Sequence, residues 1–268
     1  MKAQEKLKNK LDKDLHICVG LDTDKSKIPK HLTADKEGVL EFNKAIISET
    51  HESAAAYKIN FAFYEEAGAE GMEMLAQTLK FIPHDVLVIG DAKRGDIGNT
   101  SKMYAKSLFE HFKLDASTLS PYMGEDSLRP FLDYTDKLHF ILALTSNPGS
   151  HDFEKLELTS GKKLYQEVIQ KVNKWNKYNN CGIVFGATNL EELKENIKSF
   201  GDLIVLLPGV GAQGGDLEGI VSTFKQNSNN NFIVNVSRAL LYADSSKDFA
   251  KTSKLILQDY NRIIQHLD

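Results

Sequence analysis

The sequence predicts an α/β protein, a single (β/α)8 TIM barrel that extends over residues 1–268. Two observations support this prediction. About eight short apolar segments alternate with helix-like segments, and such alternation over roughly 250 residues is typical of this barrel. No stretch with the composition of an interdomain linker divides the chain, and we find no repeat of fixed period. A doubly wound open sheet is the alternative, because alternation alone does not establish closure of the sheet.

The expected strands are apolar runs, most of which end in polar or charged residues. They cover 17–22, 54–60, 86–91, 116–119, 139–144, 181–186, 203–207 and 232–235. Helices are expected between them, near 33–47, 71–79, 104–112, 128–132, 163–178 and 189–197, with a closing helix over 255–264. A Lys-rich segment that carries Leu7 and Leu11 predicts a short amphipathic helix covering one end of the fold.

The composition is that of an ordinary globular protein, with 41% hydrophobic and 26% charged residues. A net charge of −4 argues against a nucleic-acid-binding surface.

The N-terminus lacks the apolar core of a signal peptide, and no apolar run reaches membrane-spanning length. We therefore expect a cytoplasmic protein without a membrane partner. In that setting Cys18 and Cys181, which both lie in strand-like runs, are expected to be buried thiols rather than a disulfide.

Residues 91–100, with the sequence DAKRGDIGNT, carry the densest group of candidate catalytic residues. They follow the apolar run 86–90 and precede a helical pattern. Asp91 and Lys93 are expected to point to the same face, because side chains alternate along a strand. In a barrel both would stand at the C-terminal mouth, where such barrels keep their chemistry. Asp96 follows in the turn. A solvated charged loop is the alternative interpretation.

Other strand ends also carry residues that are capable of chemistry. Asp22, Lys58 and Ser146 each follow an apolar run, and in a parallel barrel these ends would meet at one mouth. Each residue also has a purely structural explanation. Asp22 would cap a turn, Lys58 would extend its ammonium to solvent, and Ser146 would be a turn residue before Pro148.

A glycine-rich loop at 208–216 predicts a phosphate site. Its glycines allow backbone N–H groups to approach an anion, Gln213 is a further donor, and the loop includes Pro208 and Gly214. It lacks the ending of a P-loop and the position of a Rossmann fingerprint. Ser237 and Arg238 follow the eighth expected strand, and barrels often bind phosphate with the loops after strands seven and eight. Arg238 supplies a planar fork that matches phosphate oxygens.

Taken in order, these residues resemble the orotidine 5′-phosphate decarboxylase family, in its longer bacterial type (type 2). The Asp91–Thr100 stretch resembles the family's Asp-x-Lys-x-x-Asp signature with its following threonine. Five further segments match along nearly the whole chain: 19–22, 57–58, 145–149, 208–215 and 237–238. Segment 121–127 is similar to the longer type. One departure is Thr23, where the family pattern has proline.

The resemblance implies decarboxylation of orotidine 5′-monophosphate to uridine 5′-monophosphate in pyrimidine biosynthesis, without cofactor or metal. It implies a homodimer with shared active sites, in which Asp96 and Thr100 cross to the partner subunit. The implied catalytic residues are Lys58, Asp91, Lys93 and Asp96. The implied substrate-binding residues are Asp22 and Thr100 for ribose, Ser146 for the pyrimidine edge, and Pro208, Gln213, Gly214, Ser237 and Arg238 around the phosphate.

Two alternatives remain open from the sequence. A related enzyme of the same superfamily would act on a linear sugar phosphate and would need acidic residues placed for Mg²⁺. A non-catalytic barrel would bind the nucleotide without turnover, although the complete Lys58, Asp91, Lys93 and Asp96 set argues against it.

Overall fold

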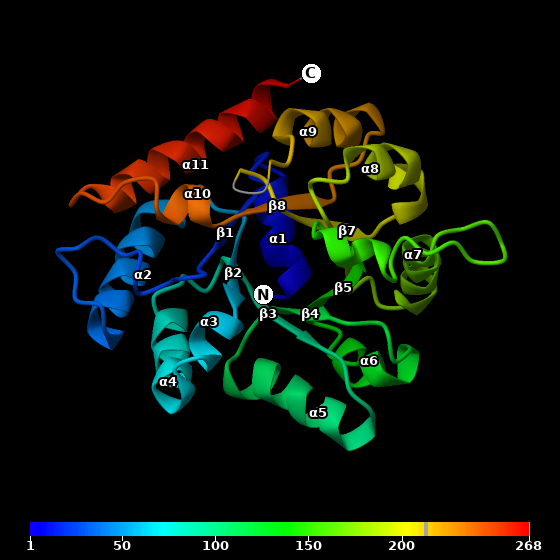
Figure 1. Cartoon of the computed structure of the whole chain (residues 1–268), viewed down its shortest axis with the longest axis horizontal. Helices are drawn as coiled ribbons and strands as arrows, with labels where there is room; N and C mark the ends of the chain where they lie inside the picture. The colour runs from blue at the N-terminus through cyan, green and yellow to red at the C-terminus, as the bar shows by residue number, and fades with distance from the viewer. Residues whose placement is uncertain (212–213, 268) are drawn as a thin grey trace.

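The computed structural model describes residues 1–211 and 214–267. Its eight strands are all parallel and close into a barrel in sequence order, because β8 pairs with β1 (Figure 1). The predicted barrel is confirmed, and the open-sheet alternative is wrong. Among the described residues, no helix is both long enough and apolar enough to cross a membrane.

The strands agree with the expected segments to within a few residues, apart from β3. They are β1 (Ile17–Gly20), β2 (Ala56–Asn60), β3 (Leu87–Arg94), β4 (Ala116–Leu119), β5 (Leu138–Leu144), β6 (Cys181–Phe185), β7 (Ile204–Pro208) and β8 (Phe232–Val236). The helices on the outside are α2 (Lys36–Thr50), α3 (Ala62–Glu65), α4 (Gly68–Leu79), α5 (Gly98–Lys106), α6 (Glu125–Leu132), α7 (Leu164–Trp175), α8 (Leu190–Asn196), α9 (Leu217–Gln226), α10 (Arg238–Leu241) and α11 (Phe249–His266).

Aspartate side chains cap the N-termini of two helices, α2 and α9. The Asp35 side chain accepts a hydrogen bond from the Gly38 N–H at 3.0 Å and caps α2. Asp216 caps α9 in the same way, accepting from the Gly219 N–H at 2.9 Å. Such caps satisfy backbone donors that have no partner within the helix.

The barrel interior is filled by apolar side chains from alternate strand positions, most of them small or aliphatic. These inward residues form one core cluster, which includes Cys18, Ala56, Ile89, Phe140, Leu206 and Ile233. Helix α1 (Ala3–Leu11) contributes Leu7 and Leu11 to the same cluster, and Figure 1 shows it across the centre of the barrel. The predicted covering helix is confirmed. Because apolar side chains and α1 fill this part of the interior, the space available to a ligand lies toward the C-terminal strand ends.

A second, larger cluster lies between the outer faces of the strands and the helices. It includes Val19, Tyr57, Ile141, Val205 and Val234 from the strands. Strand residues of both faces are therefore buried, which explains why the strands appear as continuous apolar runs rather than alternating ones. Both cysteines are buried and free, as predicted.

The structure differs from the sequence prediction mainly around β3. The expected strand ended at Asp91, whereas β3 continues through Lys93 to Arg94. The helix expected to run on to Phe112 leaves α-helical geometry at Lys106 and ends as a π-turn, η1 (Ser107–His111). The short helix α3 was not predicted, since four residues give no readable period.

Candidate active site

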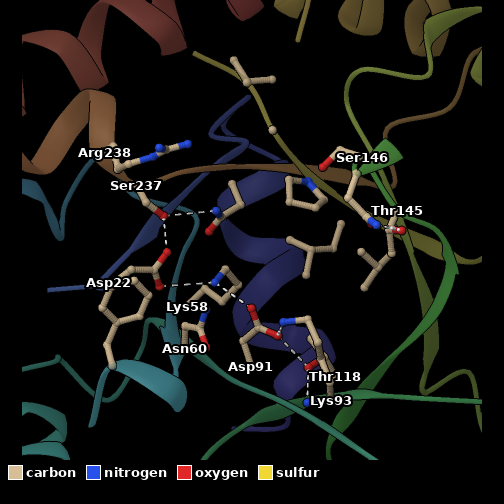
Figure 2. Close-up of a pocket in the computed structure, with 18 of the residues that line it drawn as sticks. Asp22, Lys58, Asn60, Asp91, Lys93, Thr118, Thr145, Ser146, Ser237 and Arg238 are labelled. Atoms are coloured by element: carbon tan, nitrogen blue, oxygen red, sulfur yellow. Dashed lines mark hydrogen bonds and ion pairs between the residues drawn. The ribbon is translucent and has the colours of Figure 1, made fainter. Parts of the chain in front are cut away.

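A pocket of about 390 Å³ opens at the C-terminal ends of the barrel strands (Figure 2). Deeper in the barrel, the inward-facing strand positions carry apolar side chains. At the strand ends that line this pocket, several positions carry polar side chains instead. The lining includes Asp22, Lys58, Asn60, Asp91, Lys93, Thr118, Ser146, Pro208, Asn235, Ser237 and Arg238. Residues from both ends of the chain thus meet in one cavity.

Asp91 is the centre of a charged array. Its Oδ2 accepts a hydrogen bond from Lys58 Nζ at 2.8 Å, and its Oδ1 accepts one from Lys93 Nζ at 2.7 Å. Thr118 Oγ1 also donates to Oδ1, at 2.8 Å. The carboxylate therefore holds two ammonium groups, one on each oxygen.

The three charged side chains differ in burial. Lys58 and Asp91 are buried, whereas the Lys93 side chain is 49% exposed in the pocket. Burial alone would raise the pKa of Asp91, but the Lys58 and Lys93 ammonium groups hold that pKa well below its usual range. Burial alone would lower the pKa of Lys58, but the Asp91 and Asp22 carboxylates raise it above its ordinary value. Both members of this pair are ionised at neutral pH.

Backbone conformation places the Lys93 ammonium. Lys93 has φ of 47°, a left-handed conformation that is uncommon for a residue with a side chain. The Thr118 hydroxyl accepts the Lys93 N–H at 2.9 Å and supports this conformation. The predicted same-face placement of Asp91 and Lys93 is confirmed by their direct contact. This left-handed residue, which lies where the register of β3 against β4 shifts between Gly90 and Arg94, was not predicted, because the sequence contains no glycine at this position.

Asp22 lies on the other side of Lys58. Its Oδ1 is 3.5 Å from Lys58 Nζ, and its Oδ2 accepts a hydrogen bond from the Ser237 hydroxyl at 2.8 Å. Figure 2 shows the Asp22 carboxylate between the Ser237 and Lys58 side chains. The explanation of Asp22 as a turn cap is therefore not needed, since its carboxylate faces the pocket.

Ser146 lines the pocket at the end of β5. Its backbone packs so closely against Gly186 that a Cβ on Gly186 would lie 2.7 Å from the Ser146 nitrogen. The preceding residue, Thr145, donates its N–H to Glu154 Oε2 at 2.7 Å, and its carbonyl accepts from Asn189 Nδ2 at 3.1 Å. These contacts fix the strand end that carries Ser146.

The loops after β7 and β8 form the remaining wall. Pro208 and Arg238 both line the pocket, as the predicted phosphate site requires. Gly209, Gly211 and Gly214 have φ of 112°, 79° and 79°, values that favour glycine. Gly214 is exposed and lies outside the pocket lining. Gln213 lies outside the described residues.

Asp96 and Thr100 do not join the other predicted residues. Neither lines this pocket; Asp96 is partly exposed in the turn after β3, and Thr100 is exposed on α5. Sequence reasoning also missed several pocket residues, among them Asn60, Thr118 and Asn235. Asn60 and Asn235 are polar residues near the ends of apolar runs, which was an available signal. Thr118 lies within the run 116–119 and gave no such signal.

The fold and this pocket together define a (β/α)8-barrel enzyme with a buried lysine–aspartate array beside a glycine-rich loop and an arginine. A model of the "Orotidine 5'-phosphate decarboxylase / HUMPS family" matches residues 15–252. The chain belongs to this family.

Curated relatives and solved structures agree with that membership. The chain is 46% identical over 254 residues to the orotidine 5′-phosphate decarboxylase of Christiangramia forsetii, covering 94% of this chain and 93% of that one. It is 48% identical over 237 residues to the enzyme of the same name from Porphyromonas gingivalis, covering 87% and 86%. The solved structure of Leishmania donovani OMP decarboxylase superposes with a TM-score of 0.85 at 35% identity, covering 99% of each chain.

Proposed function

We propose that this protein decarboxylates orotidine 5′-monophosphate to uridine 5′-monophosphate in pyrimidine biosynthesis. In this proposal the enzyme acts in the cytoplasm, and residues 1–268 form a single catalytic domain of the longer bacterial type. The observation that carries the proposal is the Lys58–Asp91–Lys93 array at the mouth of the barrel. The relatives named above carry this activity in their names.

The chemistry requires what the array offers. Loss of carbon dioxide from C6 of the pyrimidine leaves a carbanion that no neighbouring carbonyl is placed to delocalise. Fixed positive charge beside C6 stabilises it, and the exposed Lys93 ammonium supplies both that charge and the proton. The reaction therefore needs no cofactor. The uncatalysed reaction is very slow, so the site must lower the barrier by about 20 kcal/mol.

Asp91 has two roles in this proposal. It fixes both ammonium groups, and its negative charge lies near the expected position of the substrate carboxylate. Repulsion there destabilises the bound substrate relative to the transition state. The phosphate is assigned to Arg238, Gln213 and the 208–216 loop, far from C6. Its binding free energy favours closure of the loop and preorganises the charges.

We also propose a homodimer in which Asp96 and Thr100 complete the partner's pocket. Two observations support it. Neither residue lines the pocket of its own chain, although each belongs to the signature stretch. Two large apolar side chains close to them in the sequence are exposed, Ile97 at 58% and Met103 at 52%. Exposed apolar patches of this kind mark contact surfaces.

The test is to follow the ultraviolet absorbance of orotidine 5′-monophosphate with the purified protein, with and without excess chelator. We expect turnover that survives the chelator. Turnover that requires added Mg²⁺, or turnover of a linear sugar phosphate instead, would favour the related sugar-phosphate enzyme. Binding of uridine 5′-monophosphate without any turnover would favour a non-catalytic nucleotide-binding barrel.

A further inference from the structure

We infer that Asn235 is a positioning residue of this site, whose amide holds the Ser237 hydroxyl in the orientation that donates to Asp22. This inference rests on the proposed function, together with the ribose-binding role that the family resemblance implies for Asp22. It concerns the accuracy with which the ribose is held rather than the chemical step at C6.

The direction of the hydrogen bonds carries the inference. Asn235 Nδ2 donates to Ser237 Oγ at 3.3 Å, and Ser237 Oγ donates to Asp22 Oδ2 at 2.8 Å. A serine hydroxyl has one hydrogen and two lone pairs. Because the amide occupies a lone pair, the hydroxyl hydrogen is directed to the carboxylate.

The neighbouring strands leave room for this chain of bonds. Asn235 is paired in register with Cys18 on β1 and with Pro208 on β7, so it lies on the wall between Asp22 and the glycine-rich loop. A Cβ on Gly20 would lie 1.9 Å from Ser237 Oγ and 3.2 Å from Asn235 Oδ1. The bare backbone of Gly20 is what allows the Ser237 hydroxyl to reach Asp22.

Packing alone does not account for an amide at this position. Asn235 is 8% exposed, and its Oδ1 is buried without a hydrogen-bond partner among the described residues. An unsatisfied buried acceptor is destabilising. A leucine has the same branched shape at Cγ and would remove that penalty, but it would not donate to Ser237. The amide therefore serves the Ser237–Asp22 contact.

The consequence is a carboxylate that is held on both oxygens. Lys58 lies on the Oδ1 side of Asp22 and Ser237 holds Oδ2. Each carboxylate oxygen retains a lone pair for a substrate hydroxyl. A group that is already oriented before the substrate arrives loses less freedom on binding it, so the affinity for the ribose is higher.

The test is a double-mutant cycle with Asn235→Leu and Ser237→Ala, measuring KM, kcat and melting temperature. We expect Asn235→Leu, which removes a neutral hydrogen bond, to raise KM by about two- to tenfold. Ser237→Ala, which removes a hydrogen bond to a charged group, should raise KM by about 10- to 100-fold, and kcat should be nearly unchanged in both variants. In the Ser237→Ala background, Asn235→Leu should add less than about twofold, because its partner is gone. The melting temperature of Asn235→Leu should not fall. If that variant does not fold, Asn235→Ala replaces it in the same cycle.

Additive effects of the two substitutions, or an unchanged KM in the Asn235 variant, would overturn the inference. Substrate analogues that lack one ribose hydroxyl give an independent check. The penalty of the Asn235 variant should shrink for the analogue that lacks the hydroxyl held by Asp22, and an equal penalty with every analogue would also overturn it. Failure of the proposed function is recognised separately, since the wild-type protein would then not decarboxylate orotidine 5′-monophosphate at all.

Discussion

Lys58 Nζ lies 2.8 Å from Asp91 Oδ2, and the two side chains are only 5% and 9% exposed. A buried ion pair of this kind is strongly destabilised when one partner is removed, because the other charge remains desolvated. The Lys58–Asp91 contact therefore serves both the proposed catalysis and the stability of the fold. It links β2 to β3 at the mouth of the barrel.

The environment of the Asp91 carboxylate predicts that the folded protein loses stability at acid pH. Its pKa is lower in the folded protein than in the unfolded chain, because Lys58 and Lys93 stabilise the charged form against the cost of burial. Its contribution to stability is present above the ordinary aspartate pKa of about 4 and is lost as the pH falls below it. The raised pKa of Lys58 acts in the opposite direction, so the contribution of Lys58 is lost only at strongly alkaline pH.

We therefore expect the free energy of unfolding of the wild-type protein, measured with urea, to fall between pH 5 and pH 3 by more than that of Asp91→Asn. Asp259→Asn, which alters an exposed ion pair on α11, is the matched control and should follow the wild type. The same pH dependence in wild type and Asp91→Asn would contradict the assignment.

Removal of the Lys93 ammonium should separate turnover from binding. Lys93→Ala is expected to lower kcat by at least about 100-fold, the range for loss of a general acid, while uridine 5′-monophosphate still binds. Because Lys93 also stabilises the buried Asp91 carboxylate, the melting temperature should fall, but by less than on removal of the buried Lys58. Lys174→Ala, on the exposed face of α7, is the control. Turnover within tenfold of wild type would remove Lys93 as the proton donor.

Arg238 should act only through the phosphate. Arg238→Ala is expected to weaken binding of the phosphorylated substrate by about 10- to 100-fold, because a hydrogen bond to a charged group contributes about 1.5–3 kcal/mol. Binding of the nucleoside without phosphate should hardly change. Arg262→Ala, an exposed arginine on α11, controls for net charge. Equal losses for nucleotide and nucleoside would place Arg238 outside the phosphate site.

The shared site can be tested by mixing two inactive variants, Lys93→Ala and Asp96→Ala. In a two-fold dimer each subunit would give its Asp96 to the partner's pocket, so a mixed dimer has one doubly defective site and one intact site. Random pairing makes about half of the dimers mixed, and the mixture should regain about a quarter of wild-type activity after unfolding and refolding together. Refolded dimers that regain no activity would show that Asp96 acts within its own subunit.

The sequence determined the alternation of strands and helices and placed most of the candidate site residues at strand ends. Apolar runs that alternate with helix-like segments predicted parallel strands, and strand ends carrying Asp22, Lys58 and Asp91 predicted a shared site, because parallel strands bring their C-terminal ends together. The resemblance added expected roles for individual residues, Asp96 and Thr100 among them. Both inferences depend on local pattern, which the sequence contains directly.

Only the tertiary structure decided which residues contact one another across the barrel. Closure brings β8 beside β1, and this places Ser237 against Asp22 although 215 positions separate them in the chain. Thr118 and Asn235 became pocket residues for the same reason, since the direction of a strand side chain depends on the register of its neighbours. The left-handed conformation of Lys93 is likewise supported by Thr118 on the next strand. Such contacts depend on sheet geometry, which no local pattern specifies.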